Sequence, residues 1–164
     1  MEESCFPVSL EEQARLEPHA LLLGTPGHSR TSNTDFFLHG LFRLFPGERQ
    51  RIQVLFPEGE THRRLALTSD GSCIFLGTEG CILPRTDRPF YCRLYPFWYI
   101  NAGLFTFSSR QCLAVNRVSS TAGLCALFKT DPSALRALYD TLRTAWGLPT
   151  DEQRYISCAK NCSS

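Results

Sequence analysis

The spacing of apolar residues along the chain predicts helices at several places. Between residues 35 and 45 the apolar side chains recur as in a buried helix, which should end at Pro46-Gly47. A longer C-terminal helix is expected over about 132–146, with Asp131 capping its first turn. The stripe that this helix should turn towards the core consists of Leu135, Leu138, Tyr139, Leu142 and Trp146.

Two further stretches favour short helices. Ser9-Leu10-Glu11-Glu12 matches a capping box, so a helix should run from Leu10 to about Leu16 or Glu17 and be closed by Pro18. The apolar segment AGLCALF (residues 122–128) is also typical of a buried helix and would place the thiol of Cys125 in the core.

Alternating and turn-rich segments predict two hairpins. The first pairs strands 52–56 and 64–68 around the polar turn PEGETH. The second pairs 95–100 with 104–107 around Asn101-Ala102-Gly103, where a glycine allows positive φ. The segment 24–33 is rich in turn-forming residues and is expected to be a loop.

These elements indicate an α+β protein with short β-hairpins, a few helices and an irregular, cysteine-rich centre. At 164 residues the chain is expected to form a single domain over 1–164, with a core that needs no disulfides. The net charge of +1 gives no electrostatic reason to expect nucleic acid as a partner. No apolar run approaches the ~20 residues that span a bilayer, so no membrane association is expected.

The first residues, MEESCFPVSLEEQ, lack the basic-then-apolar pattern of a secretory signal, which predicts a cytoplasmic protein in a reducing compartment. The chain contains 8 cysteines. In an intracellular chain that number favours metal ligation or redox chemistry over a disulfide framework.

The centre of the chain, about 71–112, carries the cysteines Cys73-x7-Cys81-x10-Cys92-x19-Cys112. Cys73, Cys81 and Cys92 each follow turn-forming residues, where backbone amides can point at sulfur, and Arg88 and Arg93 could offset the charge of several thiolates. None of the spacings is the paired C-x2-C of a zinc ribbon. Spacing alone therefore leaves two interpretations open, a thiolate metal site or buried thiols that act as small apolar side chains.

The segments GSCIFL, GCILPRTDRP and YCRLYPF resemble the signature of the CxxCxxCC (YkgJ-like) family of zinc- or iron-chelating domains. The matching positions are Cys73, Phe75, Leu76, Gly80, Cys81, Arg88, Pro89, Cys92, Arg93, Tyr95, Pro96 and Phe97. Cys112 occupies the place of a further family cysteine. The dense cysteine cluster with which the family opens is matched here only by Cys5, so either the chain begins late or the upstream ligands are lost.

The resemblance implies a metal-binding protein that holds zinc or iron, or an iron–sulfur cluster, through Cys73, Cys81, Cys92 and Cys112, with Cys5 as a substitute or additional ligand. A closed zinc site would contribute folding energy, whereas iron would permit redox chemistry. Cys158 and Cys162 are one helical turn apart and form a weaker candidate pair.

Two alternatives stay open, and neither names a substrate or a protein partner. Domains of this type also resemble part of the flagellin lysine N-methylases, which would make the chain an accessory or catalytic domain of a protein-modifying enzyme. The other alternative is a metal-free thiol protein. The histidines (His19, His28, His39 and His62) lack a paired spacing and are expected to be surface or hydrogen-bonded side chains rather than ligands, and the acids near the cysteines are expected to be solvated.

Overall fold

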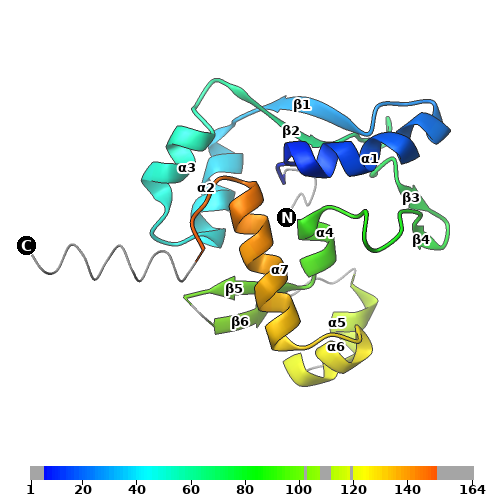
Figure 1. Ribbon diagram of the computed structural model, residues 1–164, viewed down its shortest axis with the longest axis vertical. Helices are drawn as coiled ribbons and strands as arrows, with labels where there is room; N and C mark the ends of the chain where they lie inside the picture. Colours follow the sequence, from blue (N-terminus) through cyan, green and yellow to red (C-terminus); the bar gives the residue numbers. More distant parts are fainter. Residues whose placement is uncertain (1–5, 102, 108–111, 119, 151–164) are drawn as a thin grey trace, which may run out of the picture. The chain divides into compact units, whose positions relative to one another are not determined.

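The computed structural model describes residues 6–101, 103–107, 112–118 and 120–150. In this part of the chain, helices accompany three two-stranded antiparallel sheets, so the predicted α+β class is confirmed (Figure 1). The chain divides into two compact units, Met1–Pro89 and Phe90–Ser164. The boundary between the units falls inside the segment 71–112 that the sequence predicts to be the metal-binding centre.

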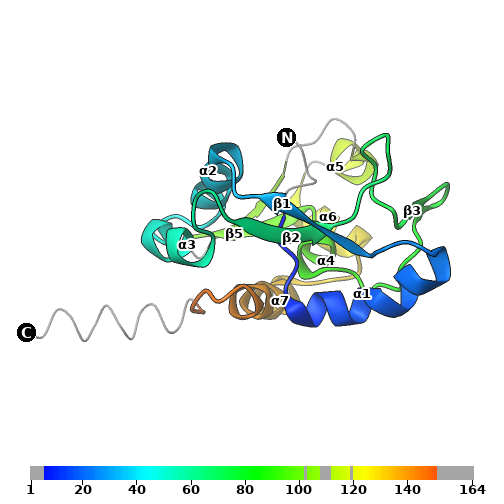
Figure 2. The same ribbon diagram turned by 90° about the horizontal axis from the view of Figure 1, so that it is seen from above.

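The described residues of the first unit form three helices and two small sheets. Its elements are α1 (Leu10–Leu23), β1 (His28–Ser32), α2 (Asp35–Leu44), α3 (Arg49–Leu55), β2 (Thr61–Leu65), β3 (Leu76–Gly77) and β4 (Gly80–Cys81). The ribbon formed by β1 and β2 runs between the α2–α3 pair at one end and α1 with the β3–β4 hairpin at the other (Figures 1 and 2).

Helix α1 begins at the predicted capping box. The Ser9 hydroxyl accepts from the Glu12 amide at 3.2 Å, and the Glu12 carboxylate accepts from the Ser9 amide at 2.7 Å. The predicted end at Pro18 is wrong, because the helix continues to Leu23. Pro18 removes one backbone hydrogen bond. The continuation buries Ala20 on the same face as Leu16, which offsets that local cost.

The first predicted hairpin is also wrong. Residues 52–56, expected to be a strand, lie mostly in α3, and β2 instead pairs with β1, inside the segment 24–33 expected to be a loop. The register joins His28 to Leu65 and Ser32 to Thr61. A short segment with one buried residue, Ile52, carries too little periodicity to distinguish a helix from a strand.

The α2 helix, predicted over 35–45, is confirmed at Asp35–Leu44 and is capped by the Thr34 hydroxyl. Its buried Phe37 stacks on the His62 ring of β2 with centroids 3.8 Å apart. His62 Nδ1 lies 2.8 Å from the Asn33 side-chain oxygen, so a buried polar contact fixes the ring on the helix. His62 is thus hydrogen-bonded, as the sequence led us to expect.

An apolar cluster in this unit consists of Val8, Leu16, Ala20, Phe75 and Leu83. It joins the inner face of α1 to the segments on either side of the β3–β4 hairpin. Cys73 and Cys81 are partly buried against this cluster. The packing of α1 therefore positions two of the predicted ligands.

The second unit contains α4 (Phe90–Leu94), β5 (Phe97–Ile100), β6 (Gly103–Thr106), α5 (Leu113–Arg117), α6 (Thr121–Leu127) and α7 (Pro132–Ala145). The predicted second hairpin is confirmed as β5–β6, and the predicted C-terminal helix as α7. The positive φ expected at the glycine of this turn is found at Asn101 instead, at 48°, and Gly103 lies in β6.

Helix α7 turns its predicted stripe inwards. Leu135, Tyr139 and Leu142 are buried, and the Tyr139 ring meets the Trp98 ring of β5 edge to face at 5.2 Å. The Tyr99 hydroxyl donates to the Pro132 carbonyl at 2.7 Å, which ties β5 to the first turn of α7. The predicted α6 is also confirmed, with Cys125 buried as expected.

A helix that crosses a bilayer must be both long and apolar. Among the helices of the described residues, none combines the length and the apolar character that crossing a bilayer requires.

Replacing the cap of α1 tests how firmly this helix is held. Ser9→Ala removes the hydroxyl that accepts from the Glu12 amide, and we expect a loss of about 1 kcal/mol in the free energy of unfolding, measured by urea denaturation. Ser133→Ala is the control, because Ser133 is an exposed position near the start of α7. Equal effects of the two substitutions would contradict a stabilising role for the capping box.

Candidate metal centre

A tight turn precedes the first candidate ligand, Cys73. The Asp70 carboxylate accepts from the Thr68 hydroxyl and, at 3.2 Å, from the Ser72 amide. Gly71 takes φ of 83°, which a residue with a side chain rarely adopts. The Thr68 hydroxyl and the Ser72 amide hold the pKa of Asp70 below its ordinary value by favouring the carboxylate. The turn therefore delivers Cys73 to the edge of the apolar cluster with little freedom.

Cys73 itself lies in an antiparallel bridge with Leu67. Burial raises the pKa of its thiol, and this effect is opposed by the Phe75 amide, which hydrogen-bonds to the sulfur. The neighbouring Cys81 raises the pKa further, because two thiolates repel each other. Without a bound cation, Cys73 therefore favours the protonated thiol.

Cys81 lies in β4, directly opposite Leu76 of β3. The Leu76 amide donates to the Cys73 carbonyl at 2.9 Å, so the same residue links both cysteines. The hairpin closes at Gly80, whose φ is 107°. Two candidate ligands that the sequence separates by a turn and a hairpin are thus brought together in the first unit.

Arg88 fixes the chain that follows Cys81. Its guanidinium donates from Nε to the Leu83 carbonyl at 3.0 Å and from Nη2 to the Cys81 carbonyl at 3.2 Å. These bonds close the loop behind Cys81 and hold a positive charge beside the cysteine backbone.

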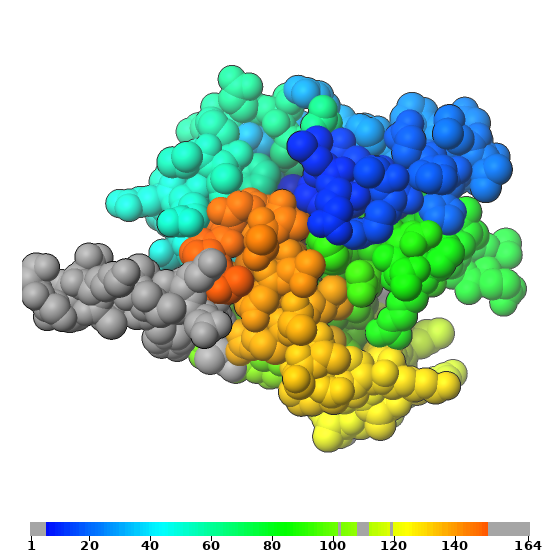
Figure 3. All heavy atoms as spheres, viewed as in Figure 1, coloured from blue at the N-terminus to red at the C-terminus, as the bar shows by residue number. Residues whose placement is uncertain are grey.

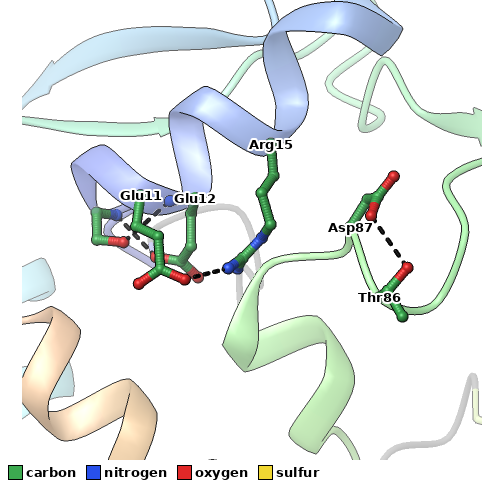
Figure 4. A network of polar contacts seen from close by, with 6 residues as sticks. Glu11, Glu12, Arg15, Thr86 and Asp87 are labelled. Atoms are coloured by element: carbon green, nitrogen blue, oxygen red, sulfur yellow. Dashed lines mark hydrogen bonds and ion pairs between the residues drawn. The ribbon is translucent and has the colours of Figure 1, made fainter.

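A polar contact joins this loop to α1. His19 Nε2 lies 2.7 Å from an Asp87 carboxylate oxygen, and the Thr86 hydroxyl donates to the other at 3.0 Å. Figure 3 shows α1 (dark blue) against the green segment that contains this loop. In Figure 4, the Arg15 side chain forms an ion pair with Glu11 of the same helix, α1, and lies on the side of the helix that faces Asp87.

The hydrogen bond from His19 is the largest influence that lowers the pKa of Asp87, followed by the bond from Thr86 and the charges of His19 and Arg15. Our expectation that the acids near the cysteines are merely solvated is wrong for Asp87. His19 is a hydrogen-bonded side chain, as expected.

The remaining candidates lie in the second unit or outside the described residues. Cys92 is exposed on α4, and Cys112 is half-buried at the residue before α5. Burial raises the pKa of Cys125, first among its causes, in keeping with a core thiol. Cys5, Cys158 and Cys162 lie outside the described residues.

The structure thus brings together Cys73 and Cys81, whereas Cys92 and Cys112 belong to the other compact unit. Within the described ranges, three or more His, Cys, Asp or Glu side chains are nowhere grouped as a metal would require. The four- or five-ligand set that the resemblance implies remains a prediction.

Comparisons of this chain with protein-family models, curated proteins and solved structures find no match.

The His19–Asp87 contact was not predicted from the sequence. The two residues are 68 positions apart, and neither belongs to a motif in which a histidine and an acid occur at a fixed spacing. The signal that would have found them is the turn at Pro84–Pro89 folding back on α1, and that is a tertiary property.

A titration tests the contact between α1 and the loop. The pKa of Asp87, followed by carbon-13 NMR of its carboxyl group, should lie below the ordinary value of 3.8 and should rise towards it in His19→Gln. The pKa of Asp87 is lower in the folded state than in the unfolded state. The stabilisation by the contact is therefore fully present above the ordinary pKa of 3.8 and is lost as the pH falls through the lowered pKa of the folded state.

His39→Gln provides the matched control, since His39 is exposed on α2 and its side chain has no contact with the loop. An Asp87 pKa that His19→Gln leaves unchanged would show that the imidazole does not hold the carboxylate.

Proposed function

We propose that this protein binds zinc or iron through cysteine thiolates, with Cys73 and Cys81 as the first two ligands. The observation that carries the proposal is their placement. Leu76 donates to the backbone of Cys73 and is the cross-strand partner of Cys81. Both cysteines pack against the same apolar cluster, and the charge of Cys81 acts on the pKa of Cys73. The YkgJ-like signature that contains both residues supports it.

The chemistry of the donors suits a soft or borderline metal. Thiolates bind zinc and iron strongly, and the Phe75 amide bonded to the Cys73 sulfur is the type of outer contact that orients a thiolate ligand. A divalent cation would also offset the repulsion between the two thiolates. Because burial raises the pKa of Cys73, metal binding there must release a proton, so affinity should increase with pH.

Two thiolates leave a tetrahedral ion without a full set of ligands. Under the proposal the others come from Cys92, Cys112 and Cys5, the positions that the resemblance implies. Zinc held by four thiolates would stabilise the fold, whereas iron or an iron–sulfur cluster would supply a redox centre.

The packing of Cys73 against the apolar cluster favours the metal-free thiol alternative, because a partly buried thiol that keeps its proton needs no cation. The two functions predict opposite results when the cysteines are replaced. The enzymatic alternative resembling the flagellin lysine N-methylases requires in addition an open or exchangeable metal.

Metal content and cobalt substitution test the proposal. Protein purified without oxygen or chelator should carry near-stoichiometric zinc or iron, and Co²⁺ exchanged into it should give thiolate-to-metal charge-transfer absorption. Cys73→Ser and Cys81→Ser should each lose most of the metal and weaken this absorption, because each removes a first ligand.

Cys125→Ser is the matched control, because Cys125 is a buried thiol on α6 in the other unit. This variant should keep its metal. Metal content that is unaffected in both Cys73→Ser and Cys81→Ser would overturn the proposal. Protein that holds no metal but retains its fold when these cysteines are replaced would support the thiol alternative. Zinc or iron that exchanges freely with added chelator would favour the enzymatic one.

A further inference from the structure

The ribbon formed by β1 and β2 turns different side chains to its two faces. Cross-strand partners in an antiparallel pair project from the same face, and neighbouring pairs alternate. The pair Thr31↔His62 lies on the face that packs on α2, because His62 is buried against Phe37. The pairs His28↔Leu65, Arg30↔Arg63 and Ser32↔Thr61 therefore lie on the opposite face, and Leu65 at one end of it packs against the apolar cluster of α1.

Two arginines occupy directly opposite positions on that face. Arg30 is exposed and Arg63 half-buried, and their positions are paired across the strands. Side chains in directly opposite positions leave Cβ atoms about 4.5–5.5 Å apart, and like charges at that separation destabilise a sheet. In the described part of the chain neither guanidinium forms an ion pair that would relieve the repulsion.

On the side away from Leu65, the next pair on the face, Ser32↔Thr61, carries hydroxyl groups. Arg30 Nη1 donates to the Thr61 hydroxyl at 3.3 Å, which places both side chains on the same face. Ser32, the cross-strand partner of Thr61, is exposed. The face therefore presents two guanidinium forks and two hydroxyls along a short piece of ribbon.

We propose that this face, made by Arg30, Arg63, Ser32 and Thr61, binds a phosphate monoester group. A guanidinium group can donate two parallel N–H hydrogen bonds to two oxygens of one phosphate, and hydroxyl groups can donate to the remaining oxygens. A phosphate monoester carries close to two negative charges at neutral pH, which balances the two guanidinium charges, whereas a single carboxylate balances only one.

A site with only two arginines favours a single phosphate group as the ligand over a nucleic-acid polymer. The chain has a net charge of only +1, so it lacks the extended positive field with which proteins hold a polyanion. The site does not rest on the proposed metal function, since none of its four side chains is a candidate metal ligand.

The experiment compares two double variants that lose the same charge. Arg30→Gln/Arg63→Gln removes the paired arginines, and Arg43→Gln/Arg51→Gln removes two exposed arginines on α2 and α3. The thermal midpoint of each protein is measured at low salt, then with inorganic phosphate, phenyl phosphate or acetate, each against sodium chloride of equal ionic strength.

At low salt without phosphate, Arg30→Gln/Arg63→Gln should have a higher midpoint than the wild type, because the repulsion is gone. Phosphate should raise the midpoint of the wild type and of the control variant above the value in chloride, and should leave Arg30→Gln/Arg63→Gln unchanged. In an NMR titration the double loss should weaken phosphate binding by about 10- to 100-fold or more.

Phosphate and chloride that raise the wild-type midpoint equally would overturn the proposal, because screening alone would explain the effect. Acetate as effective as phosphate would also overturn it. Phenyl phosphate that binds more tightly than inorganic phosphate would identify an organic monoester as the ligand, and equal binding would identify the free ion. If the double variant does not fold, Arg63→Gln alone should still abolish the difference between phosphate and chloride.

Discussion

The packing of α1 on the segment around the β3–β4 hairpin is the interaction on which the candidate site depends. Leu16 and Ala20 of the helix meet Phe75 and Leu83 in one buried cluster. Full burial of a leucine or phenylalanine side chain contributes roughly 1.5–3 kcal/mol, and the Ala20 methyl contributes less. Because short two-residue strands have little stability of their own, this cluster is what holds the backbone that carries Cys73 and Cys81.

Polar contacts fix the loop after Cys81, which lies beside the apolar cluster. Arg88 closes the loop behind Cys81 through two carbonyls, and the His19–Asp87 contact ties the same loop to α1. Apolar packing is non-directional, so it brings segments together without fixing the position of a sulfur atom. The directional bonds from Arg88 and from the Phe75 amide supply that precision.

The two proposals use opposite features of one small unit. At the cysteines, two groups that become negative on deprotonation lie together at a partly buried edge, and a cation would relieve their repulsion. On the β1–β2 ribbon, two groups that are always positive lie together at the surface, and an anion would relieve theirs. On the ribbon the free protein bears an electrostatic cost that an anion would offset, whereas at the cysteines the repulsion arises only when the thiols lose their protons, as metal binding requires.

Local sequence determined the capped starts of α1, α2 and α7, the apolar stripe of α7 and the β5–β6 hairpin, because caps, helical periodicity and turn residues act over a few positions. It also indicated which cysteines are candidate ligands. Only the tertiary structure decided that β2 pairs with β1, that α1 continues through Pro18, and that His19 meets Asp87. These outcomes depend on contacts between residues far apart in the chain, whose burial outweighs local preference.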